Sequence, residues 1–149
     1  MRWSLVALIT LMLATTVLAR HTGASEANDA AQLERIATTF NHEYSVNDVG
    51  PVWDRWDLAS QVAISRDRYV LWHQECRVNP GPSTTLAAMP LKGGWWRVDY
   101  EISGVVLHDY WHRLNGKWRF SLVRSNPSAF ALYSTNYAHY ARAMGCAGV

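Results

Sequence analysis

The sequence predicts an α+β domain in which N-terminal helices pack on a curved antiparallel sheet and a helical tail ends the chain. Three patterns support this fold class. Apolar residues recur at helical spacing before residue 77, an alternating pattern fills residues 95–124, and helical spacing returns after residue 127. With 149 residues, of which 49% are hydrophobic and 17% charged, the chain has the size and composition of one globular domain.

Residues 1–19 are predicted to be a secretory signal peptide. Arg2 precedes an uncharged stretch over residues 5–19, which fits the apolar region of a signal and is short for a membrane-spanning helix. The small residues before position 20 suit a cut after Ala19, and a cut after Ala24 is the alternative. We expect a flexible leader over residues 20–27, a single domain over residues 28–149, and a secreted or extracytoplasmic protein whose membrane contact is limited to an uncleaved signal.

Three helices are expected before the sheet. Asn28 or Asp29 can cap the first helix, Pro51 suits the first turn of the second, and Ser65 can cap the third. Each has apolar residues on one side, which are Leu33, Ile36, Ala37, Phe40 and Tyr44, then Val52, Trp53 and Trp56, then Tyr69, Trp72, His73 and Cys76.

The alternating region predicts strands over residues 95–102, 105–113 and 117–124, and a further short strand over residues 84–89 is an alternative. Asn115-Gly116 is a strong hairpin signal, and Ser103-Gly104 is either a second tight turn or a bulge. Two-residue turns at both places set the register. They pair Trp111 with Phe120, Asp109 with Leu122, Leu107 with Arg124, Tyr100 with Leu107, Val98 with Asp109 and Trp96 with Trp111. One face then carries Trp96, Val98, Tyr100, Ile102, Val105, Leu107, Asp109, Trp111, Trp118, Phe120 and Leu122, and the other face is polar.

The chain has two cysteines, Cys76 and Cys146. In an exported protein such a pair predicts a disulfide, which would stabilise the fold by roughly 4 kcal/mol for a loop of this length. The tail is expected to form a helix through Tyr133 and a last helix that Ser134 or Thr135 caps and Gly145 ends.

Asp109 is the one acid on the apolar sheet face. Burial would raise the pKa of its carboxyl group and suit it for general acid or base catalysis. The alternatives are a structural tie, in which Asp109 accepts hydrogen bonds from a helix, and a register shifted by one residue, which would place Asp109 in solvent.

The chain is rich in aromatic residues, with 8 Trp, 7 Tyr and 3 Phe. Most are expected in the core, and some are expected to line an apolar ligand cavity between sheet and helices. In a third interpretation Trp95, Tyr110 and Tyr133 are exposed and stack on sugars or on a partner. The residues expected to line the cavity are Trp56, Trp96, Trp111, Trp118 and Phe120.

Other functional classes have little support. A formal charge of +2 without a basic cluster argues against a nucleic-acid-binding protein. His108 and His112 would lie about 13 Å apart along one strand, too far to share a metal ion. No nucleophile elbow or phosphate-binding loop occurs in the sequence, so we expect neither a metal nor a cofactor.

Several motifs resemble those of one superfamily. Trp53-Asp54-Arg55-Trp56-Asp57-Leu58 is followed by Ser65-Arg66-Asp67-Arg68-Tyr69, and Asp109-Tyr110-Trp111 by Asn115-Gly116-Lys117-Trp118-Arg119-Phe120. Over roughly residues 30–125 these motifs, with the order of helices and strands, resemble exported bacterial members of the nuclear transport factor 2-like superfamily, which has a cystatin-like fold. In this superfamily the curved sheet is cone-like. The chain departs from that pattern in having three clear strands rather than four to six, and a helical tail that would cover the mouth of the cone.

That resemblance implies either a binding domain or an enzyme, since the superfamily contains isomerases, dehydratases, cyclases and non-catalytic domains. In its enzymes an Asp, His or Tyr projects into the cone, and Asp109 matches that position. We expect an exported non-catalytic domain that binds an apolar small molecule or a protein partner of the cell envelope, and a homodimer is compatible with this expectation. The alternatives are an isomerase or lyase, with Asp109 as base and the Tyr100 hydroxyl as donor, and sugar or cell-wall binding through exposed aromatic residues.

Overall fold

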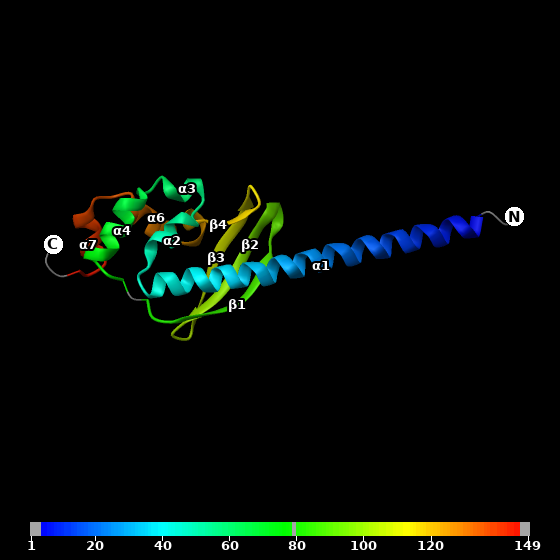
Figure 1. Ribbon diagram of the computed structural model, residues 1–149, viewed down its shortest axis with the longest axis horizontal. Helices are drawn as coiled ribbons and strands as arrows, with labels where there is room; N and C mark the ends of the chain where they lie inside the picture. Colours follow the sequence, from blue (N-terminus) through cyan, green and yellow to red (C-terminus); the bar gives the residue numbers. More distant parts are fainter. Residues whose placement is uncertain (1–3, 79, 147–149) are drawn as a thin grey trace.

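The computed structural model describes the backbone of residues 4–78 and 80–146, and within these ranges the side chains from residue 24 onward. It confirms the α+β fold class, with N-terminal helices packed on an antiparallel sheet and helices at the C-terminal end. The long helix α1 (Ser4–Ser45) runs beside the sheet and continues beyond it toward the N-terminus (Figure 1).

Short helices precede and follow the sheet in the sequence. Those before it are α2 (Val49–Asp54), α3 (Leu58–Gln61) and α4 (Arg66–Glu75), and those after it are α5 (Leu122–Ser125), α6 (Pro127–Tyr133) and α7 (Tyr137–Ala143). Asn126 caps α6 and Asn136 caps α7, because each side chain accepts a hydrogen bond from a backbone N–H of the first turn. The cap of the last helix is therefore Asn136 rather than Ser134 or Thr135.

Four strands form the sheet in the order β1 (Ser83–Pro90), β2 (Trp95–Ile102), β3 (Val105–Leu114) and β4 (Lys117–Phe120), and the 3-10 turn η1 (Lys92–Gly94) joins the first two. The predicted pairs Trp96–Trp111, Val98–Asp109, Tyr100–Leu107 and Trp111–Phe120 are confirmed. Both two-residue turns set this register, because Ser103-Gly104 and Asn115-Gly116 all have positive φ, as such hairpin turns require.

The last strand is shorter than predicted. It ends at Phe120, whose backbone is bonded to the segment after α2: Phe120 N donates to Arg55 O at 2.9 Å, and Asp57 N donates to Phe120 O at 2.8 Å. The chain then turns into α5, so the predicted pairs of Asp109 with Leu122 and of Leu107 with Arg124 do not form. The strand considered over residues 84–89 does form, as β1, with a bulge between Thr85 and Ala87.

Helix α1 begins earlier than predicted. The helix was expected to start at Asn28 or Asp29, yet residues 20–27, expected to be a flexible leader, already belong to it. Apart from Gly23 these residues include no strong helix breaker, and two alanines favour the helix. Within the described part of the chain, no helix combines the length and the apolar character needed to cross a membrane.

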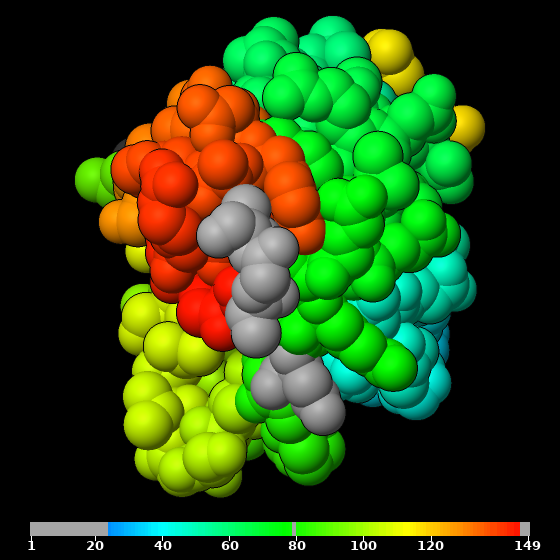
Figure 2. Space-filling view, turned by 90° about the vertical axis from the view of Figure 1, so that its left-hand side faces the viewer, coloured from blue at the N-terminus to red at the C-terminus, as the bar shows by residue number. Residues whose placement is uncertain are grey.

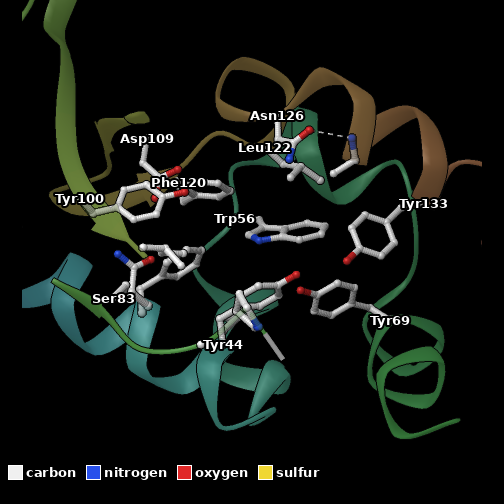
Figure 3. A pocket seen from close by; sticks show the side chains of 17 residues that line it. Tyr44, Trp56, Tyr69, Ser83, Tyr100, Asp109, Phe120, Leu122, Asn126 and Tyr133 are labelled. Atoms are coloured by element: carbon white, nitrogen blue, oxygen red, sulfur yellow. Dashed lines mark hydrogen bonds between the residues drawn. The ribbon is translucent and has the colours of Figure 1, made fainter. Parts of the chain in front are cut away.

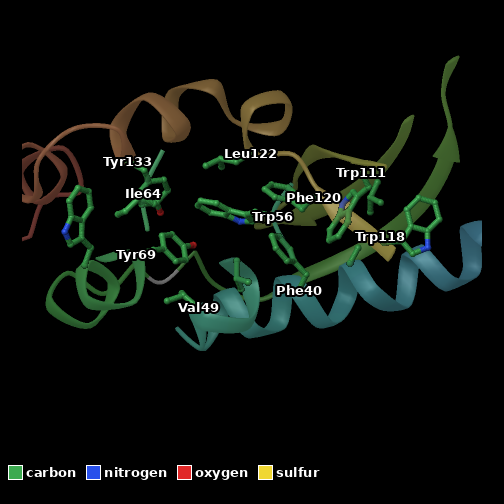
Figure 4. Close-up of a cluster of buried hydrophobic side chains, with 14 of the residues drawn as sticks. Phe40, Val49, Trp56, Ile64, Tyr69, Trp111, Trp118, Phe120, Leu122 and Tyr133 are labelled. Carbon is green, nitrogen blue, oxygen red and sulfur yellow. The ribbon is translucent and has the colours of Figure 1, made fainter. Parts of the chain in front are cut away.

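The core extends from the space between α1 and the inner sheet face into the space among the short helices α2, α4 and α6 (Figure 4). Phe40 of α1 contacts Trp111 edge-on at 5.1 Å and Phe120 at 4.7 Å between ring centroids. The helices do not cover the whole face, however. At the end of the sheet near the Ser103-Gly104 turn, Val105 and Leu107 are 58% and 39% exposed, although both were expected in the core.

The predicted disulfide between Cys76 and Cys146 is confirmed, with the two Cα atoms 5.7 Å apart. It joins the end of α4 to the segment that follows α7. Figure 2 shows the consequence at the surface, where the C-terminal segment in orange and red lies against the green segment that contains α4.

Candidate functional site

A cavity of about 130 Å³ lies between the inner sheet face, the C-terminal part of α1, α4 and α6. Figure 3 shows Asp109 and Tyr100 at one end of it, Tyr69 and Tyr133 at the other, and Trp56 between them. None of the described lining residues is basic. The aromatic lining residues are Phe40, Tyr44, Trp56, Tyr69, Tyr100, Phe120 and Tyr133.

The predicted cavity residues divide into two groups. Trp56 and Phe120 line the cavity, but Trp96, Trp111 and Trp118 do not. These three lie farther along the sheet, where α1 covers them: Trp118 Nε1 donates to Gln32 Oε1 at 3.0 Å. Strand alternation sends all of them to the inner face, but it does not say how far along the strand the covering helix reaches.

Asp109 is 5% exposed and lines the cavity. Burial raises the pKa of its carboxyl group to about 8, and no hydrogen bond or ion pair to another described residue lowers it again. The structural tie to a helix considered above is therefore absent among the described residues, and the register is not shifted. At neutral pH the group is a carboxylic acid that can donate one hydrogen bond into the cavity.

Tyr100 is two residues along β2 from Val98, the residue paired with Asp109, and therefore lies beside Asp109 on the same face. Its side chain is half-buried. Burial, and then the negative charge that Asp109 carries when ionised, raise the pKa of the Tyr100 hydroxyl above its ordinary value. The hydroxyl therefore stays protonated throughout the physiological range. It can act as a donor, the role expected for it.

Two further polar groups of the lining have no partner among the described residues. The indole Nε1 of Trp56 and the amide Nδ2 of Asn41 are both buried without a hydrogen bond. In Figure 3 the indole nitrogen lies at the end of the Trp56 ring nearer Asp109 and Tyr100. Because an unpaired buried donor costs about 1–3 kcal/mol, this end of the cavity favours a molecule that supplies a hydrogen-bond acceptor.

The opposite end contains polar residues that were not predicted from the sequence to line the cavity. Tyr44, Tyr69 and Tyr133 line it, and His73 lies behind Tyr133 with Nε2 2.9 Å from the hydroxyl oxygen. Burial lowers the pKa of His73 to about 4, so the imidazole is neutral at neutral pH. The signal in the sequence is a histidine on the apolar side of a predicted helix, but its tyrosine partner is 60 residues away in the chain.

The outer sheet face does not form an open aromatic platform. Tyr133, which one interpretation had exposed on the helical tail, is buried. The Trp95 ring is already in contact with the Arg124 guanidinium at 4.4 Å and with the His112 ring at 4.5 Å. Arg124 also lies 5.6 Å from the Tyr110 ring. These contacts occupy the rings that a sugar would need, so the outer face lends no support to the sugar-binding alternative.

The cavity is thus an aromatic-walled site with hydrogen-bond donors at one end and a cluster of hydroxyl groups at the other. Such a site can hold a small apolar ring and orient it by polar contacts, and its one acid can exchange a proton near neutral pH. No family model, no curated protein and no solved structure matches the chain, so membership of the nuclear transport factor 2-like superfamily stays a prediction.

Proposed function

We propose that the protein binds a small, largely apolar molecule about the size of one aromatic ring, with an oxygen acceptor directed at Asp109. The observation that supports this proposal is an aromatic-walled cavity of about 130 Å³, lined at one end by the Asp109 carboxyl group, which has no partner among the described residues. Apolar cavities of about 150 Å³ bind benzene, which sets the scale of the ligand.

The polar end favours an acceptor rather than a cation. At neutral pH the Asp109 carboxyl group is protonated, and the nearby indole N–H of Trp56 can only donate. A carbonyl oxygen would satisfy such donors, whereas an ammonium group would leave the indole N–H unpaired.

We also propose that binding takes place outside the cytoplasm. The signal-like segment before residue 24 supports this, and so does the Cys76–Cys146 disulfide, since such bonds persist in oxidising compartments.

Acetophenone and ethylbenzene test the binding proposal, because they match in shape and differ in the carbonyl oxygen. We expect acetophenone to quench or shift tryptophan fluorescence and to bind about ten-fold more tightly below pH 8 than ethylbenzene does. Its affinity should fall as pH rises through 8, because ionised Asp109 no longer donates.

Two variants control this experiment. Asp109→Asn keeps an N–H donor, so it should bind acetophenone without the pH dependence, and Asp67→Asn, on an exposed acid of α4, should behave as the unaltered protein. If neither compound binds, the proposed function is wrong. If ethylbenzene binds equally well at every pH, the acceptor preference is wrong.

Proton-transfer catalysis at Asp109 is a second candidate function, and the pKa of about 8 favours it. A carboxylate with this pKa is a stronger base than an ordinary aspartate, yet it is partly ionised near neutral pH. In deuterated water, the methyl protons of acetophenone should then exchange faster with rising pH, as NMR can follow. Exchange that is no faster than with Asp109→Asn would exclude this role for the tested compound.

A further inference from the structure

The end of the cavity remote from Asp109 brings together hydroxyl groups from three elements. Tyr44 comes from α1, Tyr69 from α4 and Tyr133 from α6. Figure 3 shows their hydroxyl oxygens turned toward one another below the ring of Trp56. The rings of Tyr69 and Tyr133 are 5.1 Å apart, and Trp56 contacts both. A ring-sized ligand beside Trp56 would therefore have hydroxyl groups at one end and Asp109 at the other.

His73 determines which way the Tyr133 hydroxyl points. Its Nε2 is 2.9 Å from the Tyr133 oxygen, while its Nδ1 is buried and has no partner among the described residues. A proton on Nδ1 would be a buried donor without an acceptor, which costs more than an unused acceptor lone pair. The network therefore assigns the proton to Nε2, which donates to the Tyr133 oxygen.

This assignment turns the Tyr133 proton away from His73 and toward the hydroxyl groups of Tyr69 and Tyr44, with which Tyr133 interacts. Because its oxygen already accepts from His73, the hydroxyl directs its own hydrogen to another acceptor, either a neighbouring tyrosine oxygen or an atom in the cavity. Burial keeps His73 neutral at neutral pH, so the orientation holds over the physiological range.

We propose that Tyr133, oriented by His73, forms a second polar subsite, and that the ligand carries oxygen groups on opposite sides of one ring. The inference rests on the proposed function and names the ligand class for that same site: a para-dioxygenated aromatic or similarly substituted ring. One oxygen contacts Asp109 and the other contacts Tyr133, while Trp56, which lies between these two residues in Figure 3, packs on the ligand ring. Tyr133 is a binding residue, and His73 is a positioning residue.

Titration with acetophenone, 4′-hydroxyacetophenone and 3′-hydroxyacetophenone tests this subsite. We expect the 4′-hydroxy compound to bind about ten-fold more tightly than acetophenone, and the 3′-hydroxy compound to gain little. Tyr133→Phe should abolish the ten-fold difference without weakening acetophenone. The matched control is Tyr137→Phe, since Tyr137 packs on Trp72 outside the cavity.

His73 needs a readout that a merely structural residue would not change. We expect His73→Leu to lose the preference for the 4′-hydroxy compound while acetophenone affinity is retained, and His73→Gln, which keeps an N–H donor, to restore the preference. Equal weakening of both compounds by His73→Leu would overturn the positioning role. Should His73→Leu fail to fold, Tyr133→Phe decides the subsite by itself.

The two proposals fail in different ways. If neither acetophenone nor its hydroxylated forms bind to the protein, the proposed function is wrong. If acetophenone binds but the 4′-hydroxy compound binds no more tightly, only the second subsite is wrong. The same holds if the preference survives Tyr133→Phe.

Discussion

Asp109 has a carboxyl group that the fold buries without a described partner, and this arrangement costs stability. In the unfolded chain an aspartate ionises near pH 4, but in the folded protein burial raises the pKa of Asp109 to about 8. Between these pH values the folded protein holds a proton that the unfolded chain releases. The cost of burying this carboxyl group is therefore absent below pH 4 and grows as pH rises to 8. A residue that costs stability in this way is more readily explained by ligand binding or proton transfer than by folding.

Asp109→Asn should remove this pH-dependent cost. The amide has nearly the same shape and does not ionise, so the variant should match the unaltered protein near pH 4 and exceed it at pH 7. The shift in pKa corresponds to a gain on the order of 4 kcal/mol in the free energy of unfolding at pH 7. Urea unfolding of both proteins at a series of pH values measures this gain. A variant that is less stable at pH 7 would show that Asp109 supports the fold.

At the scale of the elements, α6 depends on one capping side chain at the rim of the cavity. Asn126 Oδ1 accepts a hydrogen bond from Ala129 N at 2.9 Å, and Pro127 follows at the first position of the helix. Asn126 also lines the cavity, and the same helix ends with Tyr133. The cap thus holds one wall of the site in place.

Asn126→Ala should lower the free energy of unfolding by about 1 kcal/mol, because the first turn of α6 loses its side-chain acceptor. Asn126→Ser keeps an acceptor oxygen and should retain most of the stability. Chemical denaturation of the three proteins gives the comparison. Equal stability of the alanine variant, or equal loss in the serine variant, would contradict the capping role.

The elements also show how far the sequence predicts this structure. Sheet register follows from Ser103-Gly104 and Asn115-Gly116, because the turn type fixes which residues oppose each other. The same register places Asp109 on the inner face of the sheet, as the sequence predicts. The end of β4 depended instead on a backbone contact with residues 55–57, which no local pattern encodes. Likewise, alternation sends Phe120 to the same face as Trp96, Trp111 and Trp118, so it could not separate Phe120 in the cavity from the three tryptophans under α1.

For the molecule as a whole, the end of the cavity that holds the tyrosine hydroxyl groups is formed by segments distant in sequence. Tyr69 and His73 lie on α4, Tyr133 lies on α6, and Tyr140 of α7 stacks on Tyr133 at 5.5 Å. The Cys76–Cys146 disulfide holds the end of α4 to the C-terminal segment. It therefore links α4, which carries Tyr69, to the C-terminal helices that carry Tyr133 and Tyr140.

Reduction of this disulfide should lower both stability and the affinity for the 4′-hydroxy compound. Closing a loop with 70 residues of separation stabilises by roughly 4 kcal/mol in the chain-entropy model, so the midpoint of thermal unfolding should fall by about 10 °C. Calorimetry with and without reductant measures the shift, and the double variant Cys76→Ala with Cys146→Ala should give the lower midpoint under both conditions.

Because the released segment carries Tyr140 and follows Tyr133, the preference for the 4′-hydroxy compound over acetophenone should weaken at temperatures where the reduced protein is still folded. An unchanged midpoint would contradict the stabilising role, and an unchanged preference would show that the hydroxyl cluster holds together without the covalent link.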